Sequence, residues 1–301
     1  MIRRVQASMA PEFGLFLALG SFAVAVLAVD GVALSQQALV LVLALAVAVT
    51  GLPHGALDPW VAWRIGLWRG RWGFVAFNVA YVGLAALVVM AWRLAPGLSL
   101  VVFLAISAWH FAGDWRQDLP SWARALAGLA LLALPAWRWP GDVDASFALL
   151  AGADGSVIAS WLRVASPWLA AGVAAVALLA QRRSRATAIE LAAVAALALL
   201  LPPLVYFVVY FCALHSLRHL RIAVGEADAS SRGPIAGVAL LYTVLTLVLA
   251  ALVWPWLAAA GTLVHTADAE LLKLVFIGLA ALTLPHMLVV MLSERAREKA
   301  R

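Results

Sequence analysis

The chain is poor in charged residues and in cysteine. Only 12% of its 301 residues are charged, well below the roughly 25% that soluble domains carry. This scarcity excludes an ordinary soluble globular protein. The one cysteine, Cys212, excludes an intramolecular disulfide and a zinc site built from several cysteines. The formal charge of +6 does not indicate a nucleic-acid partner, because the cations lie in short segments between apolar runs.

Apolar sequence takes the place of charge, since 65% of the residues are hydrophobic. Apolar runs of roughly 20 residues, the length that spans a bilayer, recur from end to end. They predict an all-α, polytopic transmembrane helix bundle of about ten spans, within a range of 8–10, that forms one integral membrane domain over residues 1–301. The first run is longer than the core of a signal peptide, so we expect a retained span. The predicted spans are residues 12–34, 36–57, 72–94, 97–117, 121–139, 157–180, 186–201, 203–223, 234–258 and 270–292.

The seventh predicted span, residues 186–201, is short and is followed by Pro202 and Pro203. A proline pair ends a helix because it removes N–H donors and restricts the preceding residue. We therefore expect a tight turn between two antiparallel helices. The alternative, one long kinked helix, would measure about 55 Å and exceed the bilayer. Glu190 in this span has a candidate partner in nearby Arg185 and needs no functional role.

The basic residues favour this span count. With the N-terminus in the cytoplasm, ten spans place the basic segments of every even-numbered loop inside, as the positive-inside rule requires. The chain is then a multi-pass protein of the cell membrane with both termini cytoplasmic. The cations placed inside are Arg3, Arg4, Arg64, Arg69, Arg71, Arg116, Arg124, Arg182, Arg183, Arg185, Arg218, Arg221, Arg295, Arg297, Lys299 and Arg301. The acidic residues placed outside are Asp30, Asp142, Asp144, Asp154, Asp268 and Glu270.

Five of the six histidines fall in the cytoplasmic halves of even-numbered spans, whereas His265 lies alone in an outer loop. His215 and His219 are four residues apart and share one helix face, so one metal ion can bind both. Imidazoles from neighbouring helices would complete a site in the bundle core near the cytoplasmic side. Such a site suits Fe, Cu, Zn or Ni. The five histidines are His54, His110, His215, His219 and His286.

Two aspartates follow a histidine by four residues, Asp58 after His54 and Asp114 after His110. A carboxylate in the apolar zone costs about 2.5–3.5 kcal/mol, so it needs a compensating role. A metal-bound histidine usually donates its other N–H to a carboxylate or a carbonyl, and we expect both aspartates to accept such bonds. The alternative is that they mark helix ends at the interface. His286 is assigned to the same outer layer around the ligands, while roles as a ligand or as pocket wall remain open.

Four motifs resemble the Brp/Blh family, the membrane-embedded microbial β-carotene 15,15′-dioxygenases that make retinal for rhodopsins. The motifs occur in the order of the family and span most of the chain. The second departs slightly, because the family reads His-Phe-Gly where Ala112 precedes Gly113 here. The motifs are Gly-Leu-Pro-His-Gly-Ala-Leu-Asp at 51–58, Trp-His-Phe-Ala-Gly-Asp at 109–114, Phe-Cys-Ala-Leu-His-Ser-Leu-Arg-His at 211–219 and Leu-Pro-His at 284–286.

This resemblance implies that His54, His110, His215 and His219 are catalytic and bind Fe(2+). It implies that O2 adds across the central 15,15′ double bond of β-carotene to give two retinal molecules. The substrate β-carotene is dissolved in the lipid bilayer, and the product retinal implies a functional link to a rhodopsin. Aromatic and apolar side chains near the motifs are the candidates for substrate binding, although they equally suit core packing. These are Trp109, Phe111, Tyr206, Phe207, Tyr210, Phe211 and Met287.

Three other membrane functions match the histidines less well. A desaturase or hydroxylase of the di-iron type has more histidines, in HxxxH and HxxHH boxes. A b-type cytochrome needs paired axial histidines one haem apart in depth, whereas the five here share one depth. A transporter would show inverted repeats and a polar site at the midplane, and the sequence indicates neither.

Reporter fusions at Gly141 and at Arg301 test the predicted topology. Gly141 follows the fifth predicted span and Arg301 follows the tenth, so we expect the two reporters to indicate opposite sides of the membrane. Reporters on the same side would show that the count of ten spans is wrong.

Overall fold

The computed structural model describes residues 10–29, 35–225, 232–258 and 266–299, and these residues form helices and turns without any β-strand. This confirms the all-α class. Local sequence sets several helix starts. Proline occupies the beginning of α1, α6, α8 and α10, where its missing N–H costs nothing and its fixed φ suits a helix. Ser35 and Ser184 cap α2 and α9, each accepting a hydrogen bond from a backbone N–H in the first turn.

The helices follow one another with short connections. Three segments combine α-helix with a π-helical or 3-10 stretch, which is labelled η. The elements are α1 (Pro11–Leu27), α2 (Gln36–Ala46), η1 (Val47–Gly51), α3 (Leu52–Gly55), α4 (Asp58–Arg64), α5 (Gly70–Leu94), α6 (Pro96–Ala112), η2 (Gly113–Trp115), α7 (Ser121–Arg138), α8 (Pro140–Ala180), α9 (Arg185–Leu200), α10 (Pro203–Phe207), η3 (Val208–Ser216), α11 (Leu217–Gly225), α12 (Arg232–Ala258) and α13 (Ala267–Lys299).

Seven helices in the described part of the chain are long and apolar enough to cross a membrane. The chain is therefore a membrane protein by the length and composition of its helices. The remaining three predicted spans are also helical, as α1, α7 and α9. With 16 residues, α9 rises about 24 Å at 1.5 Å per residue, less than the roughly 30 Å of a hydrocarbon core. The count of ten spans thus stays a prediction.

The structure differs from the sequence prediction between the fifth and sixth spans. Residues 140–156, expected as an outer loop, are mostly helical, because α8 begins at Pro140. Its helical path breaks at Ala151 and Gly152, and Gly152 has a φ of 61°, a conformation that glycine adopts without strain. A Cβ on Gly155 would lie 1.9 Å from the Phe147 carbonyl oxygen. The two parts of α8 therefore pack tightly against each other at the break.

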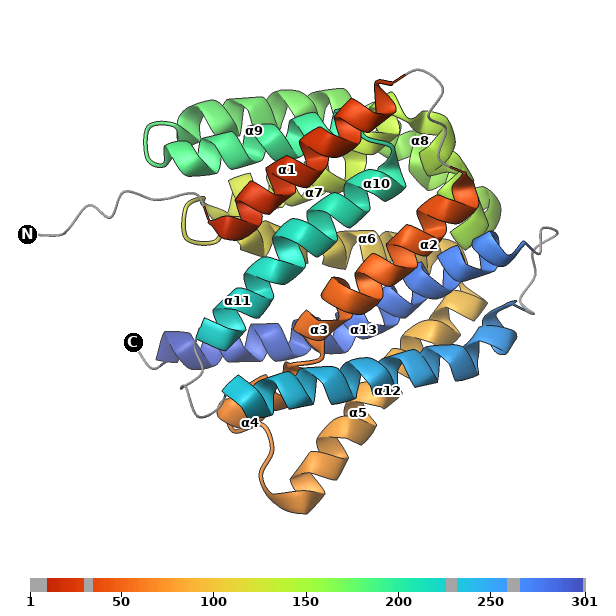
Figure 1. Cartoon of the computed structure of the whole chain (residues 1–301), viewed down its shortest axis with the longest axis vertical. Coiled ribbons are helices and arrows are strands. Elements are labelled where there is room, and N and C mark those ends of the chain that lie inside the picture. Colours follow the sequence, from red (N-terminus) through yellow and green to blue (C-terminus); the bar gives the residue numbers. More distant parts are fainter. Residues whose placement is uncertain (1–9, 30–34, 226–231, 259–265, 300–301) are drawn as a thin grey trace, which may run out of the picture.

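The turn predicted at the proline pair is confirmed. Leu201 is extended (φ −101°, ψ 143°), and α10 begins at Pro203. In Figure 1, α1, α7, α8 and α9 lie together in the upper part, and α5, α12 and α13 lie in the lower part. The α10–α11 segment and α2 run diagonally between them. The central segment η3 packs against both α1 and α2, so it contacts elements on either side.

A close contact between α6 and α7 makes a stability prediction. A Cβ on Gly128 would lie 2.0 Å from the backbone oxygen of Ala108, whereas a Cβ on Gly83 meets nothing within 4 Å. We expect Gly128→Ala to destabilise the protein by about 1–3 kcal/mol through overpacking. Gly83→Ala is the matched control and should be neutral or slightly stabilising. Thermal unfolding in detergent measures both, and equal midpoints would contradict the close packing.

Candidate metal centre

Five histidines from five elements converge in the structure. The ring centroid of His54 lies 5.2 Å from that of His286, 5.6 Å from His215, 6.2 Å from His219 and 6.5 Å from His110. The rings of His110 and His215 are 4.6 Å apart, and those of His215 and His219 are 4.5 Å apart. His265 lies outside the described residues. The five histidines, for which the sequence predicts one depth in the membrane, therefore form one compact cluster.

Two π-helical segments bring histidines into this cluster. Segment η1 directly precedes α3, which carries His54, and η3 contains His215. Pro53 lacks the N–H that would bond the carbonyl one turn earlier, which favours the wider turn of η1. Single π-turns occur frequently at functional sites. A Cβ on Gly51 would lie 2.8 Å from the Phe211 ring, so the absence of a side chain there lets η1 and η3 approach closely.

Three of the rings each donate their Nδ1–H to a protein oxygen. His215 Nδ1–H donates to Asp114 Oδ1 at 3.1 Å, His286 Nδ1–H donates to Asp58 Oδ1 at 2.9 Å, and His54 Nδ1–H donates to the Gly51 carbonyl. Such bonds fix the tautomer and leave Nε2 with a free lone pair. The His286 Nε2 atom is buried and has no hydrogen-bond partner among the described residues. Each of these rings therefore offers Nε2 as a ligand atom.

The spacing of the nitrogens fits a first-row metal ion. The His215 and His110 Nε2 atoms are 3.0 Å apart, and two nitrogens that bind one ion at about 2.1 Å and at right angles would be about 3.0 Å apart. The ligand atoms of His54, His110 and His286 lie within 4.8 Å of one another, as do those of Asp114, His215 and His219. Neutral imidazoles suit Fe, Cu, Zn and Ni. The residues present therefore fit a metal ion.

The two aspartates contact histidines from other segments. Asp58 binds His286 rather than His54, and Asp114 binds His215 and lies 3.4 Å from His219 Nε2. The i, i+4 spacing does not pair either aspartate with the histidine that precedes it, because the helix is interrupted after each of these histidines. Asp58 begins α4 after the break behind α3, and Asp114 lies in the 3-10 turn η2. Each aspartate also accepts a 2.8 Å hydrogen bond from a tyrosine, Tyr81 on Asp58 and Tyr210 on Asp114.

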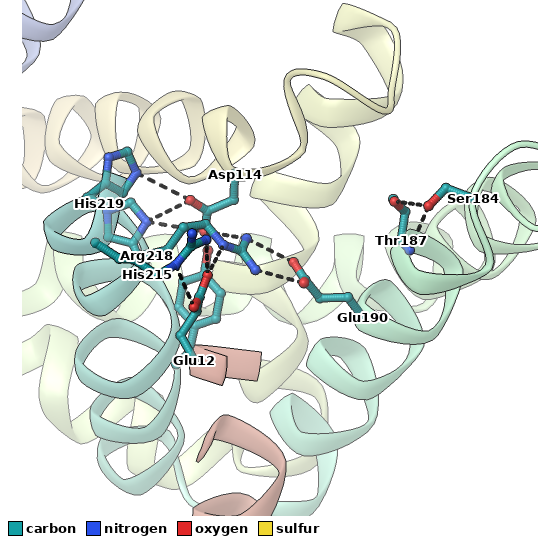
Figure 2. A network of polar contacts seen from close by, with 10 residues as sticks. Glu12, Asp114, Ser184, Thr187, Glu190, His215, Arg218 and His219 are labelled. Carbon is teal, nitrogen blue, oxygen red and sulfur yellow. Dashed lines mark hydrogen bonds and ion pairs between the residues drawn. The ribbon is translucent and has the colours of Figure 1, made fainter. Parts of the chain in front are cut away.

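A charge network anchors the segment that carries His215 and His219 (Figure 2). Arg218 donates to both carboxylate oxygens of Glu190 on α9, at 2.9 and 2.7 Å, so Glu190 pairs with Arg218 rather than with Arg185. Arg218 also lies 3.9 Å from Asp114. Arg221 binds Glu12 on α1 at 2.9 and 2.7 Å. The sequence signal for Glu12 and Glu190 was that each is a carboxylate inside an apolar segment, which requires a partner.

Two cavities meet at the histidines. The first, of about 320 Å³, is lined almost entirely by apolar and aromatic side chains and reaches His54, His110 and His286; ligand pockets of this kind measure about 300–1,000 Å³. The second, here named the polar cavity for the many charged side chains among its apolar ones, reaches His54, His219 and His286. Among the arginines that line the polar cavity are Arg64, Arg116, Arg218, Arg221 and Arg297. Basic residues of four predicted inner segments thus gather on one side of the cluster.

The structure divides the seven candidates for substrate binding. Trp109 is 58% exposed and does not line the apolar cavity, and Met287 does not line it either. Each of these two residues neighbours a clustered histidine in sequence, and one residue along a helix turns the side chain by about 100°. The candidates that do line the apolar cavity are Phe111, Tyr206, Phe207, Tyr210 and Phe211.

The fold and this site define a helical membrane protein with a histidine cluster between an apolar and a polar cavity. A sequence profile of the beta-carotene 15,15′-dioxygenase family matches residues 45–293. This match covers most of the chain, which therefore belongs to that family and is an enzyme of this class. The resemblance found in the sequence motifs is thereby confirmed.

Two relatives support the assignment. A beta-carotene 15,15′-dioxygenase from uncultured marine bacterium 66A03 is 30% identical over 253 residues, which cover 80% of this chain and 88% of that protein. A probable beta-carotene 15,15′-dioxygenase Blh from Halobacterium salinarum is 30% identical over an alignment of 328 positions, which covers 93% of this chain and 92% of that protein. No solved structure matches the chain.

The pair formed by Arg218 and Glu190 makes a second stability prediction. Glu190→Gln removes the charge that accepts two hydrogen bonds from the largely buried Arg218. We expect a loss of about 1.5–3 kcal/mol, the range for hydrogen bonds to charged groups. Glu298→Gln, at the exposed end of α13, should change stability by less than about 0.5 kcal/mol. Chemical denaturation compares the two variants, and equal stabilities would contradict an anchoring role for the pair.

Proposed function

We propose that the protein is a non-haem Fe(II)-dependent dioxygenase that cleaves the central 15,15′ double bond of β-carotene with O2. The names of the two relatives supply the substrate and the bond. The observation that carries the proposal is the convergence of five histidines at the wall of an apolar cavity. The reaction breaks one carbon–carbon double bond and places one oxygen atom on each half. Two retinal molecules account for every atom of β-carotene and O2.

His54, His110, His215 and His219 would hold the iron, which when bound supplies the oxygen-activating chemistry. Four neutral imidazoles leave room for further ligands on a six-coordinate ion, as non-haem oxygenases require. The orphaned Nε2 of His286 faces the same group of nitrogens, so His286 belongs to the set to be tested. Asp58 and Asp114 orient His286 and His215 by accepting their Nδ1–H groups.

The apolar cavity would hold the polyene. Its walls come from α5, α7, α8 and α12 as well as from the histidine-bearing segments, so a long apolar molecule can be enclosed between helices. Phe111, Phe207 and Phe211 line it beside the cluster. These rings exclude water and would position the central double bond against the histidines, which is the chief contribution a protein makes to such chemistry. We further propose that the site lies near the cytoplasmic side of a multi-pass membrane domain.

Cleavage of β-carotene tests the proposal. Purified protein supplied with iron, O2 and β-carotene in detergent should bleach the carotenoid and yield retinal, because central scission halves the conjugated chain. An iron chelator or the removal of O2 should stop the reaction. Alanine at position 54, 110, 215 or 219 should abolish turnover and lower the iron content, since an open site that loses a ligand rearranges or empties.

The sixth histidine provides the matched control. His265→Ala, in the predicted outer loop, should keep iron and turnover. Apo-carotenals of unequal length would contradict central cleavage while leaving the metal site standing. Undiminished β-carotene with well-folded, iron-loaded protein would reject the proposed reaction.

A further inference from the structure

Every tyrosine of the chain lines the apolar cavity. The sequence has four tyrosines, and Tyr81, Tyr206, Tyr210 and Tyr242 all belong to the cavity wall. Their hydroxyl groups differ in what they bind. Tyr81 and Tyr210 donate to carboxylates, Tyr242 donates to Asn78, and Tyr206 is buried without a hydrogen-bond partner among the described residues. Four similar rings in one cavity thus carry three kinds of hydroxyl environment.

The two carboxylate contacts have the same pattern. Tyr81 donates to Asp58 Oδ2 at 2.8 Å, and Asp58 accepts from His286 Nδ1 at 2.9 and 3.0 Å. Tyr210 donates to Asp114 Oδ2 at 2.8 Å, and Asp114 accepts from His215 Nδ1 at 3.1 and 3.2 Å. Both tyrosines belong to the cavity wall, with Tyr81 half-buried and Tyr210 fully buried, and each hydroxyl reaches the carboxylate that orients one histidine of the cluster.

The bonds from the tyrosines are needed by the carboxylates. The Asp58 side chain is 3% exposed and that of Asp114 is fully buried. A buried carboxylate requires several hydrogen-bond donors, and loss of one donor lets it turn or attract water. Because a histidine and a tyrosine share each carboxylate, a shift of the tyrosine changes the geometry offered to the histidine.

We propose that Tyr81 and Tyr210 are positioning residues that link occupancy of the apolar cavity to the geometry of the metal centre. A polyene that fills the cavity would move the Tyr81 ring directly and the Tyr210 ring through Phe111, whose ring centroid lies 5.3 Å away. Each hydroxyl would transmit this movement to His286 or His215 through its aspartate. The environment of the metal then depends on whether the cavity is filled. The inference rests on the proposed function, because it requires iron at the histidines and a carotenoid in the cavity.

Electron paramagnetic resonance of the ferrous protein with nitric oxide, which stands in for O2, tests this link. We expect β-carotene to change the signal of the wild-type protein. Tyr81→Phe and Tyr210→Phe should keep stoichiometric iron and the wild-type gel-filtration profile yet lose most of this change. Their kcat should fall, by less than the roughly 10–100-fold that is usual when a direct partner of a metal ligand is removed, with a smaller effect on KM.

Tyr206→Phe is the matched control, because it removes a hydroxyl from the same cavity wall without breaking a hydrogen bond of the described residues. It should retain the full spectral response to β-carotene. Wild-type responses in Tyr81→Phe and Tyr210→Phe, or an equal loss in Tyr206→Phe, would overturn the inference. So would a wild-type signal that β-carotene leaves unchanged. Wild-type protein without bound iron would instead reject the proposed function, so the two failures are distinguishable.

Discussion

The burial of two aspartates among apolar helices is the constraint on which this structure depends. A carboxylate removed from water is stable only with several donors around it. Asp114 accepts hydrogen bonds from Tyr210 and His215 and lies near Arg218. All three residues belong to the single segment η3–α11. Asp58 accepts hydrogen bonds from Tyr81 of α5 and His286 of α13. Each carboxylate therefore ties its own helix to others, and the same bonds that satisfy the charge hold two rings of the histidine cluster in fixed orientations.

Ion pairs with buried carboxylates also hold α11 in place. Arg218 stands next to Asp114 but donates its two short hydrogen bonds to Glu190, while Arg221 binds Glu12. These pairs connect α11, which carries His219, with α9 and α1. Both helices also place apolar side chains in the main core, among them Phe16 of α1 and Leu191 of α9. The ion pairs therefore add to this apolar packing and link both helices to α11.

The helices and the gathering of five histidines were predictable from sequence, because hydropathy and charge reveal depth in the membrane. Partners across helices were not. The i, i+4 rule assigns Asp58 to His54, but it holds only within an uninterrupted helix, and α4 starts afresh at Asp58. Trp109 was chosen by its closeness in sequence to His110, yet consecutive residues on a helix face different directions. The first part of α8 was not predicted, because the charged Asp142 and Asp144 are typical of a loop. The apolar side of this helical segment is evident only in the structure, where Phe147 and Leu150 pack in the core.

The candidate ligand atoms are compatible with one metal ion shared by both groups. The candidate ligands fall into two adjacent groups of three, which could suggest a binuclear site. In the group of Asp114, His215 and His219, however, the Nδ1–H of His215 donates to Asp114, so this carboxylate serves as a hydrogen-bond acceptor. The remaining Nε2 of His215 lies 3.0 Å from the Nε2 of His110 in the other group. The two groups therefore adjoin where His215 and His110 meet, and one ion bound there would contact rings of both groups.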